Sequence, residues 1–392
     1  MKKLAIPAII AAAALVTACG GNGSNGPEKF TVAVLGDFPY GTSPTDTSQV
    51  AAAPAFIQAI NSDPDVSLVL HGGDIHSGKE YCNQAYNTTV FGLISAIKVP
   101  LVYVPGDNEW ADCHKAKQGG GAYNAATGAI DYVTVNGQLA SYAGGDPIEN
   151  LAMVRSIFFP VPGKTLGGAM AVHTQAQEYD PAFPTDSQFV ENTWWVKNKV
   201  LFATVNVPGG SNNGTDPWYG SSAKSPAQIQ EIATRTGATL RWLNAAFSRA
   251  TSEGATSVVL LVQADMWDLD GNVAAHIAEY KQYIDVIATK TAAFGKPVLL
   301  FNGDSHTYRS DNPLVKGAAC VYEPSSGAAA VACTFDSFDN QPNGYNVANF
   351  HRVTFHGSTT PLEYLKLTVD PSANAANGAT AFGPFSWQRV QK

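Results

Sequence analysis

Five aspartates follow apolar, strand-like runs of sequence, and glycine directly precedes four of them. The five are Asp37, Asp74, Asp107, Asp265 and Asp304, and His306 comes two residues after the last. Gly-Asp is an ordinary turn sequence, so a single such acid favours turn or capping chemistry over metal binding. Two carboxylates about 5 Å apart, however, repel by roughly 3 kcal/mol at an effective dielectric near 20. Five acids at one sheet edge therefore predict bound divalent cations, or else protonated carboxyls.

The apolar runs that would position these acids alternate with helical stretches, which is typical of a parallel sheet with right-handed crossovers. We expect strands over residues 30–35, 66–70, 100–104, 199–205, 257–262 and 297–301, and helices over 49–61, 87–97, 148–158, 228–250 and 273–293. Ligands bind beyond the carboxyl ends of such strands, where the acids would lie. Residues 350–355 and 364–369 are expected to close the fold as an antiparallel pair.

The composition of the chain describes a globular protein and limits its partners. Of the 392 residues, 45% are hydrophobic and 14% are charged, which provides a sizeable core. The formal net charge is -8, and the sequence has no basic run. Because nucleic-acid binding depends on neutralising phosphates with lysine and arginine, this acidic balance argues against a nucleic-acid partner.

The first residues have the pattern of a secretory signal, with two lysines, an apolar run over 4–16 and small residues before Cys19. The end of this run, Val-Thr-Ala-Cys, resembles the lipobox of bacterial lipoproteins. The resemblance implies cleavage after residue 18, lipidation of Cys19 and membrane anchoring in the bacterial cell envelope, either periplasmic or at the cell surface. Residues 19–29 would form a flexible tether. A plain signal peptide with a coincidental cysteine is the alternative.

Four further cysteines are expected to form disulfides in an oxidising compartment. They are Cys82, Cys113, Cys320 and Cys333, and three pairings are open. We favour Cys320 with Cys333, because the Ser-Ser-Gly sequence at 325–327 could turn a hairpin between them, and by elimination Cys82 with Cys113. A cysteine-based zinc site is the alternative, but no close Cys-x-x-Cys spacing supports it.

The acid-bearing motifs resemble those of the calcineurin-like metallophosphoesterases, the superfamily that includes the purple acid phosphatases. The family's motifs run Asp-x-His, Gly-Asp, Gly-Asn-His-Glu or its Asp variant, a lone His after a strand, and Gly-His-x-His. Their order recurs as Gly36-Asp37, Gly73-Asp74, Gly106-Asp107-Asn108-Glu109, Gln263-Ala264-Asp265 and Gly303-Asp304-Ser305-His306. The resemblance implies an α/β/β/α sandwich with two mixed central sheets. This domain would span residues 30–392, with insertions near 111–192 and 307–346.

The resemblance also implies roles for single residues. Asp37 would bind a first metal ion, Asp74 would bridge two, and Asp107 would stand where the family has an asparagine ligand. Either Gln263 or Asp265 takes the place of the lone histidine, and we expect Asp265 to be the ligand. The expected metal ligands are therefore Asp37, Asp74, Asp107, Asp265, Asp304 and His306.

The departures from the family pattern exchange nitrogen ligands for oxygen ligands. This exchange favours two harder divalent ions, Mg²⁺ or Mn²⁺ foremost, with Ca²⁺ and Fe as alternatives, over Zn²⁺. Asn108 replaces the histidine that in the family contacts the phosphate and can protonate the leaving group. Glu109, His71 and His76 are candidates to take over that role, although His76 also fits an exposed loop residue.

The sequence thus predicts a metal-dependent phosphoesterase in which a metal-bound hydroxide attacks a small phosphorylated substrate. Asn108, Glu109 and His306 are the expected catalytic residues. Asn108, Asn213 and Tyr308 are the expected substrate-binding residues, because they lie on loops that follow strands. The alternative is a catalytically degenerate surface lipoprotein that keeps the fold and a structural cation for binding a ligand or a partner.

Overall fold

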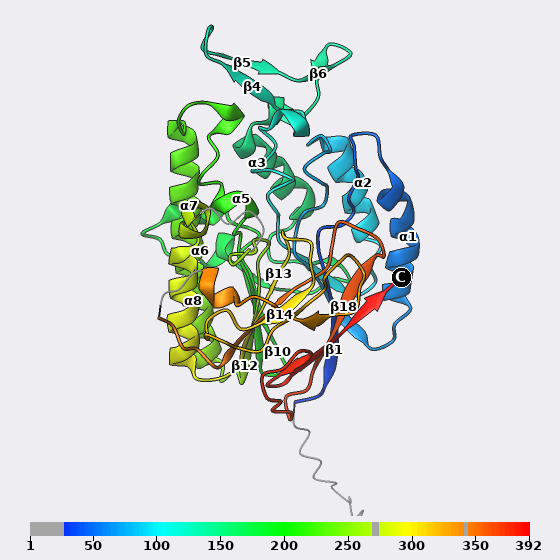
Figure 1. The fold of residues 1–392 in the computed structure, drawn as a ribbon, viewed down its shortest axis with the longest axis vertical. Coiled ribbons are helices and arrows are strands. Elements are labelled where there is room, and N and C mark those ends of the chain that lie inside the picture. The colour runs from blue at the N-terminus through cyan, green and yellow to red at the C-terminus, as the bar shows by residue number, and fades with distance from the viewer. Residues whose placement is uncertain (1–26, 269–273, 341–343) are drawn as a thin grey trace, which may run out of the picture.

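The structure is a computed structural model, and it describes residues 27–268, 274–340 and 344–392. Two β-sheets lie face to face at its centre, and helices cover their outer faces (Figure 1). The predictions of a signal sequence and of lipidation at Cys19 fall outside the described residues. They therefore stay predictions from the sequence.

The first sheet carries the loops of the first three acids. Its strands are, in spatial order, β19 (Ala381–Phe382), β20 (Phe385–Gln391), β18 (Glu363–Val369), β1 (Phe30–Leu35), β2 (Val66–His71), β3 (Pro100–Tyr103) and β8 (Leu166–Gly167). Strands β1, β2 and β3 run parallel, and β18 lies antiparallel to β1. Nearly every residue of β1 and β2 is buried, as expected for parallel strands that are covered on both faces.

The second sheet carries the loops of the remaining acids. Its strands are, in spatial order, β16 (Val331–Ala332), β15 (Val321–Tyr322), β14 (Arg309–Asp311), β17 (Phe350–Thr354), β13 (Val298–Asn302), β12 (Ser257–Leu261), β11 (Val200–Thr204), β10 (Thr193–Lys197) and β9 (His173–Thr174). Strands β11, β12, β13 and β17 run parallel to one another. Antiparallel strands flank them on both sides, so this sheet is mixed like the first.

Helices and apolar side chains complete the layers. The α-helices are α1 (Ser48–Asn61), α2 (Gln84–Ile94), α3 (Pro147–Phe158), α4 (Gln175–Glu178), α5 (Gly209–Asn212), α6 (Pro226–Ser252), α7 (Ala274–Ala278) and α8 (Lys281–Phe294). One apolar cluster packs α1, α2 and α3 on the first sheet, and another packs α6 and α8 on the second. A third cluster lies between the sheets. These layers confirm the predicted α/β/β/α sandwich.

Residues 111–192, the expected excursion from the sheets, include two hairpins that project from the body at the top of Figure 1. They consist of β4 (Gly121–Asn124) with β5 (Ala129–Tyr132) and β6 (Thr134–Val135) with β7 (Gln138–Leu139). The hairpin strands are mostly exposed. The 3₁₀ turns of the chain are η1 (Ala116–Gln118), η2 (Tyr142–Gly145), η3 (Pro184–Gln188), η4 (Trp218–Gly220) and η5 (Ser337–Asn340).

Both predicted disulfides are present. The Cys82 and Cys113 Cα atoms lie 5.7 Å apart, and those of Cys320 and Cys333 lie 5.3 Å apart. The second bond closes the hairpin of β15 and β16, as the spacing predicted. The pairing by elimination is therefore also correct.

The predicted strands agree with the observed ones to within one residue at each end, but one predicted pairing is wrong. Residues 350–355 and 364–369 do not pair with each other. Strand β17 instead lies parallel to β13 in the second sheet, whereas β18 lies antiparallel to β1 in the first. Alternation of apolar and polar residues indicates a strand but does not name its neighbour. The helix expected over 273–293 is also divided into α7 and α8, and Val273 lies outside the described residues.

No helix in the described part of the chain combines the length and the apolar character needed to cross a bilayer.

Phe355 lies at the centre of the sandwich, and replacing it should be costly. Its ring is buried against Gly36, Gly72 and Gly303, where a Cβ atom would clash with it. We expect Phe355→Ala to lower the free energy of unfolding by about 3–5 kcal/mol, because the sheets cannot fully close the cavity. Urea denaturation measures the change. Phe183→Ala is the control, because Phe183 is 42% exposed, and it should cost less than about 1 kcal/mol. Equal losses for the two variants would contradict this account of the core.

Candidate metal centre

The loops that follow the parallel strands bring acids from both sheets to one place. Asp37 follows β1, Asp74 follows β2 and Asp107 follows β3, while Asp304 follows β13 of the second sheet. Backbone hydrogen bonds tie neighbouring loops together, since the Asp37 amide donates to the Gly73 carbonyl at 2.9 Å. The amide of Asp304 donates to Asp37 Oδ1 at 3.2 Å, which joins the two sheets at the site.

Two groups of three side chains could each hold a metal ion. One consists of Asp37, Asp74 and His306, and the other of Asp74, Asp107 and Asp304. Within each group, one ligand atom per residue lies within 4.8 Å of the others. Asp74 belongs to both groups, which is the position expected of a residue that bridges two ions. The structure therefore brings together the predicted ligands except Asp265.

Glycines leave the space that these carboxylates occupy. A Cβ atom at Gly106 would overlap Asp74 Oδ1, and one at Gly209 would overlap Asp304 Oδ1. Neither glycine has a positive φ, so at these positions the missing side chain matters because of the close approach. Replacement of either glycine would displace a carboxylate from the cluster.

The cluster residues adopt an uncommon backbone conformation. Asp37, Asp74, Asp304 and His306 have φ values of 47°, 53°, 73° and 58°. Left-handed backbone is uncommon for every residue except glycine, although asparagine, aspartate and histidine adopt it more often than the others, and it persists only where surrounding structure holds it. Four such residues in one cluster indicate that the fold holds the loops in place against local preference.

Burial and mutual repulsion make the ionised acids costly. Burial is the largest cause that raises the pKa values of Asp37, Asp74 and Asp107 well above the ordinary value, and it acts in the same way on the half-buried Asp304. Neighbouring carboxylates add to the shift; Asp107, for example, raises the pKa of Asp304. A positive charge among these oxygens would reverse this effect.

The donor set fits a hard divalent cation. Asp37 Oδ2 is buried and has no hydrogen-bond partner among the described residues, so one carboxylate oxygen is left for a ligand. Each group supplies carboxylate oxygens, and His306 is the nitrogen donor. Oxygen-rich sites of this kind suit Mg²⁺, Mn²⁺ or Ca²⁺ better than Zn²⁺.

A pocket of about 400 Å³ opens above the cluster. Asp74, Asp107, Asp304 and His306 line it, and the lining also includes Tyr40, Gly41, Thr42, Ser77, Gly78, Lys79, Asn108, Lys117, Ser358 and Thr359. Its size admits a small organic phosphate.

Tyr40 and Asn108 form neutral hydrogen-bonding contacts in this pocket. The Tyr40 hydroxyl donates to Asp74 Oδ2 at 2.9 Å, and Asn108 Nδ2 donates to the Tyr40 oxygen at 2.9 Å and to Asp74 Oδ2 at 3.2 Å. His306 Nε2 lies 3.2 Å from the Tyr40 oxygen and 3.5 Å from Asp37 Oδ1. Tyr40 was missed in the sequence, although its place three residues after Asp37 was a usable signal.

Asp265 lies outside the cluster, which corrects the prediction that it is a metal ligand. Its carboxylate pairs with Arg352, and its Oδ2 atom lies 3.3 Å from Arg309 Nη1. The side chain next to the acids is that of Gln263, whose Nε2 lies 3.1 Å from Asp74 Oδ2 and 3.2 Å from Asp107 Oδ1. A buried carboxylate between two guanidinium groups is already neutralised, so it has no need of a metal ion.

Three other predicted functional residues face away from the pocket. Glu109 accepts from the Tyr103 hydroxyl at 2.6 Å and from the Gly106 amide at 2.7 Å, so it holds the loop of Asp107. Asn213 accepts from Trp218 Nε1 at 3.0 Å, and the Tyr308 oxygen accepts from Trp387 Nε1 at 3.0 Å. All three are buried and outside the pocket lining, which argues against direct contact with a substrate.

His71 and His76 do not replace the histidine that in the family can protonate the leaving group. Both are buried, and burial lowers the pKa of each to about 4, so both are neutral at pH 7. The alternative of an exposed loop for His76 is wrong for the same reason. His71 instead makes structural contacts, with its Nε2 atom 3.0 Å from the Phe38 carbonyl oxygen.

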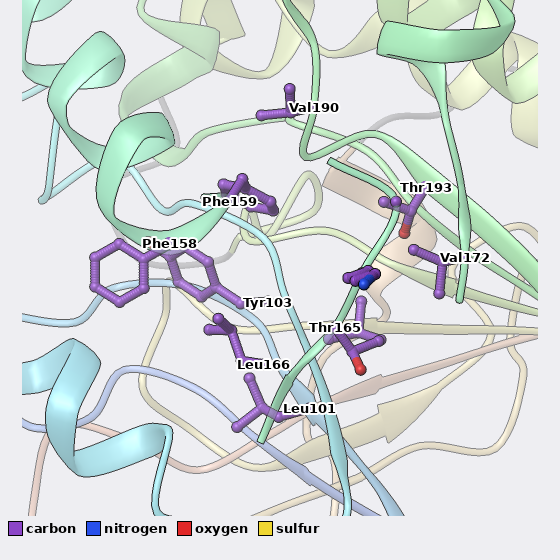
Figure 2. Close-up of a pocket in the computed structure, with 12 residues that line it drawn as sticks. Leu101, Tyr103, Phe158, Phe159, Thr165, Leu166, Val172, Val190 and Thr193 are labelled. Atoms are coloured by element: carbon purple, nitrogen blue, oxygen red, sulfur yellow. The ribbon is translucent and has the colours of Figure 1, made fainter. Parts of the chain in front are cut away.

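A second cavity, beside β3 and α3, differs in character (Figure 2). Its volume is about 20 Å³, and its lining is mainly apolar, with Leu101, Phe158, Leu166 and Val172 among it. This space suits about one water molecule and brings together no group of acids. Of these two spaces, the pocket above the carboxylates is the one whose lining brings acids together.

This chain is similar to one protein family and to solved structures. The family model of the calcineurin-like phosphoesterases matches residues 30–222, which include Asp37, Asp74 and Asp107. Among solved structures, the chain is similar to a purple acid phosphatase from seeds of yellow lupin (Lupinus luteus), with 12% sequence identity and a TM-score of 0.38. The similarity covers 93% of this chain and 52% of that one, so the chain spans about half the length of that phosphatase. The curated proteins that were compared include no significant match.

The carboxylate cluster should make the stability of the metal-free protein depend on pH. An unfolded chain releases aspartate protons near pH 4, whereas the metal-free fold holds them to higher pH. The unfolded state thus binds fewer protons above pH 4, and the free energy of unfolding should fall as the pH rises. In EDTA, thermal unfolding between pH 4.5 and 8 should show this fall, and Mn²⁺ should oppose it by about 2.7 kcal/mol per site at 100 times its Kd. Asp74→Asn/Asp304→Asn should flatten the dependence in EDTA. Parallel curves with and without Mn²⁺ would contradict the assignment.

Metal content should distinguish Asp74 from Asp265. Asp265→Asn should lower the free energy of unfolding by about 3–5 kcal/mol, because Arg309 loses its buried carboxylate partner and Arg352 keeps Asp311 but loses Asp265. The purified protein should nevertheless keep its metal. Asp74→Asn should lose at least one equivalent of Mn²⁺, because Asp74 belongs to both groups. Elemental analysis after dialysis measures the metal content of both variants. A loss of metal in Asp265→Asn together with full retention in Asp74→Asn would reverse the two assignments.

Proposed function

Because this chain belongs to the calcineurin-like metallophosphoesterase superfamily, we propose that it hydrolyses a small phosphate ester in a metal-dependent reaction. The observation that carries the proposal is the sharing of Asp74 between two groups of ligands at the base of one pocket. Asp37, Asp74, Asp107, Asp304 and His306 would hold two divalent ions, with Mg²⁺ or Mn²⁺ best suited to the oxygen donors. These ions would supply Lewis-acid stabilisation of the phosphate and would acidify the attacking water.

The protein itself would orient the substrate. Asn108 lines the pocket, and its Nδ2 donates to Asp74 and to the Tyr40 oxygen, so its N–H groups lie beside the ligand oxygens. Both N–H groups already have an acceptor, so one of them would have to leave Tyr40 or Asp74 when a substrate binds. It could then donate a hydrogen bond to a phosphate oxygen on which charge develops. The amide cannot release a proton to a leaving group. The proposal therefore favours esters whose alcohol leaves without strong acid assistance, such as aryl phosphates.

Gln118 fixes the orientation of that amide. Its Nε2 donates to Asn108 Oδ1 at 2.9 Å, which directs the Asn108 Nδ2 group toward the acids. Gln118 is fully buried, so its own position is set by packing. A donor whose amide plane is held in this way needs little reorientation once the substrate has taken the place of one acceptor, and such preorganisation is the basis of electrostatic stabilisation of a transition state.

One observation favours the second function, a degenerate binding protein with a structural cation. Asp74 Oδ2 accepts hydrogen bonds from the side chains of Tyr40, Asn108 and Gln263. Donors of the protein thus already occupy Asp74 Oδ2, an oxygen that Asp74 would need in order to bridge two metal ions. A chain that had lost catalysis could keep the fold in this way and use its exposed hairpins to bind a ligand or partner.

Cys19 bears on where either function would operate. We propose that the protein is tethered by lipid at this residue in the bacterial envelope; support comes from the cysteine after the apolar run. Its substrate would then be met outside the cytoplasm.

Turnover of model substrates tests the proposed function. Protein loaded with Mn²⁺ should hydrolyse 4-nitrophenyl phosphate or bis(4-nitrophenyl) phosphate, and EDTA should abolish the activity. Asn108→Ala should lower kcat by about 10²-fold, the usual effect of removing one donor to a developing negative charge. Asp131→Asn, on the exposed strand β5, is the control and should retain full activity. One tightly bound Ca²⁺ without turnover would contradict the enzyme and support the binding protein.

A further inference from the structure

Two lysines line the pocket above the acid cluster. Lys79 and Lys117 are exposed, whereas Asp74 and Asp107 beneath them are buried. The two lysines therefore belong to the solvent-exposed part of the lining, and the carboxylates to its buried base. No other lysine, and no arginine, belongs to this lining among the described residues.

Neither ammonium group has a counter-ion in the described part of the chain. Within residues 27–268, 274–340 and 344–392, no ion pair or hydrogen bond involves Nζ of Lys79 or Lys117. The neighbouring Lys115 shows the contrast, because its Nζ lies 2.7 Å from Asp112 and 3.5 Å from Asp216. Two free positive charges are thus retained beside a pocket in an acidic chain.

Gly78 brings the two lysines to the same part of the pocket. Lys79 follows it directly, and a Cβ atom on Gly78 would lie 3.5 Å from Lys117 Nζ and 3.2 Å from Asn108 Oδ1. Asn108 in turn donates to Asp74. Lys117, Asn108 and Asp74 therefore follow one another along the pocket wall, and Lys79 belongs to the same lining. One small ligand in this pocket can meet both the lysines and the carboxylates.

The charges at the base of the pocket explain why these lysines would matter. The four carboxylates of the cluster offset the charge of two divalent ions, so the loaded base would carry little net positive charge for an anion. Lys79 and Lys117 are the side chains in the lining that can supply it. A substrate with an uncharged alcohol part would leave both without a counter-ion.

We propose that Lys79 and Lys117 bind a second anionic group, a carboxylate or a second phosphoryl group, on the alcohol part of the substrate. The substrate class is thus a phosphate ester that carries another negative group. The inference rests on the proposed function for the end of the ligand that meets the acid cluster. Recognition at the mouth depends on the lysines alone, and it can be measured by binding without turnover.

Three non-hydrolysable probes test this proposal on the full chain loaded with Mn²⁺. They are phenylphosphonate, 4-carboxyphenylphosphonate and 1,4-phenylenediphosphonate, and calorimetric titration gives a Kd for each. At least one probe with a second anionic group should bind about tenfold more tightly than phenylphosphonate. The probe that gains more affinity over phenylphosphonate shows whether the lysines bind a carboxylate or a phosphoryl group better. Added salt should reduce this ratio, because the lysines are exposed.

Lysine variants show whether this ratio of Kd values depends on Lys79 and Lys117. In Lys79→Met/Lys117→Met it should fall to about 1, and in each single variant to about 3. Lys98→Met, which removes an exposed lysine outside the pocket, should keep the wild-type ratio. A wild-type ratio near 1, or one that survives in the double variant, would overturn the proposal. Lysine-dependent binding without hydrolysis of any aryl phosphate would support it while the proposed enzyme function fails. If no phosphonate binds the loaded protein, both fail.

Discussion

Repulsion among buried carboxylates is the constraint on which this structure depends. Asp37, Asp74, Asp107 and Asp304 come from loops of two different sheets, and burial with mutual proximity raises their pKa values. Local geometry does not favour the arrangement either, since three of the four adopt left-handed backbone. The packing of the two sheets must therefore hold the loops together. Phe355 does this most directly, because its ring contacts the glycines that precede three of the acid-bearing turns.

A buried ion-pair network supports the same loops from one side. Arg352 on β17 pairs with Asp265 and, at 2.7 Å, with Asp311 on β14. Asp265 also accepts from the Ser305 hydroxyl at 2.8 Å, and its amide donates to Asp304 Oδ2 at 3.2 Å. Asp265 thus positions the loop of Asp304 and His306 through neighbouring atoms. Its charge is matched by arginines, whereas in the described part of the chain no lysine or arginine forms an ion pair with the acids of the cluster.

The sequence predicted most of the sandwich and the gathering of four acids, because apolar strands and the residues after them are local features. The role of Asp265 could not be predicted in the same way. Gln263 and Asp265 both follow β12, and only the position of Arg352, far along the chain, decides which faces the acids. The predicted pairing of β17 with β18 failed for a similar reason. The chain crosses from one sheet to the other between these strands, and no local pattern shows that crossing. Tyr40 and the two pocket lysines belong to loops whose course has no periodic signal.

The disulfide between Cys82 and Cys113 joins two segments that each carry a lysine of the pocket lining. Lys79 lies three residues before the first cysteine, and Lys117 lies four residues after the second. The Sγ atom of Cys82 lies 3.3 Å from the carbonyl oxygen of Asn108, so the bond also borders the segment that orients the amide. A covalent link at this point sets a limit on how far the two segments can separate. Reduction of the bond would remove this limit, and disulfides form in compartments that are oxidising.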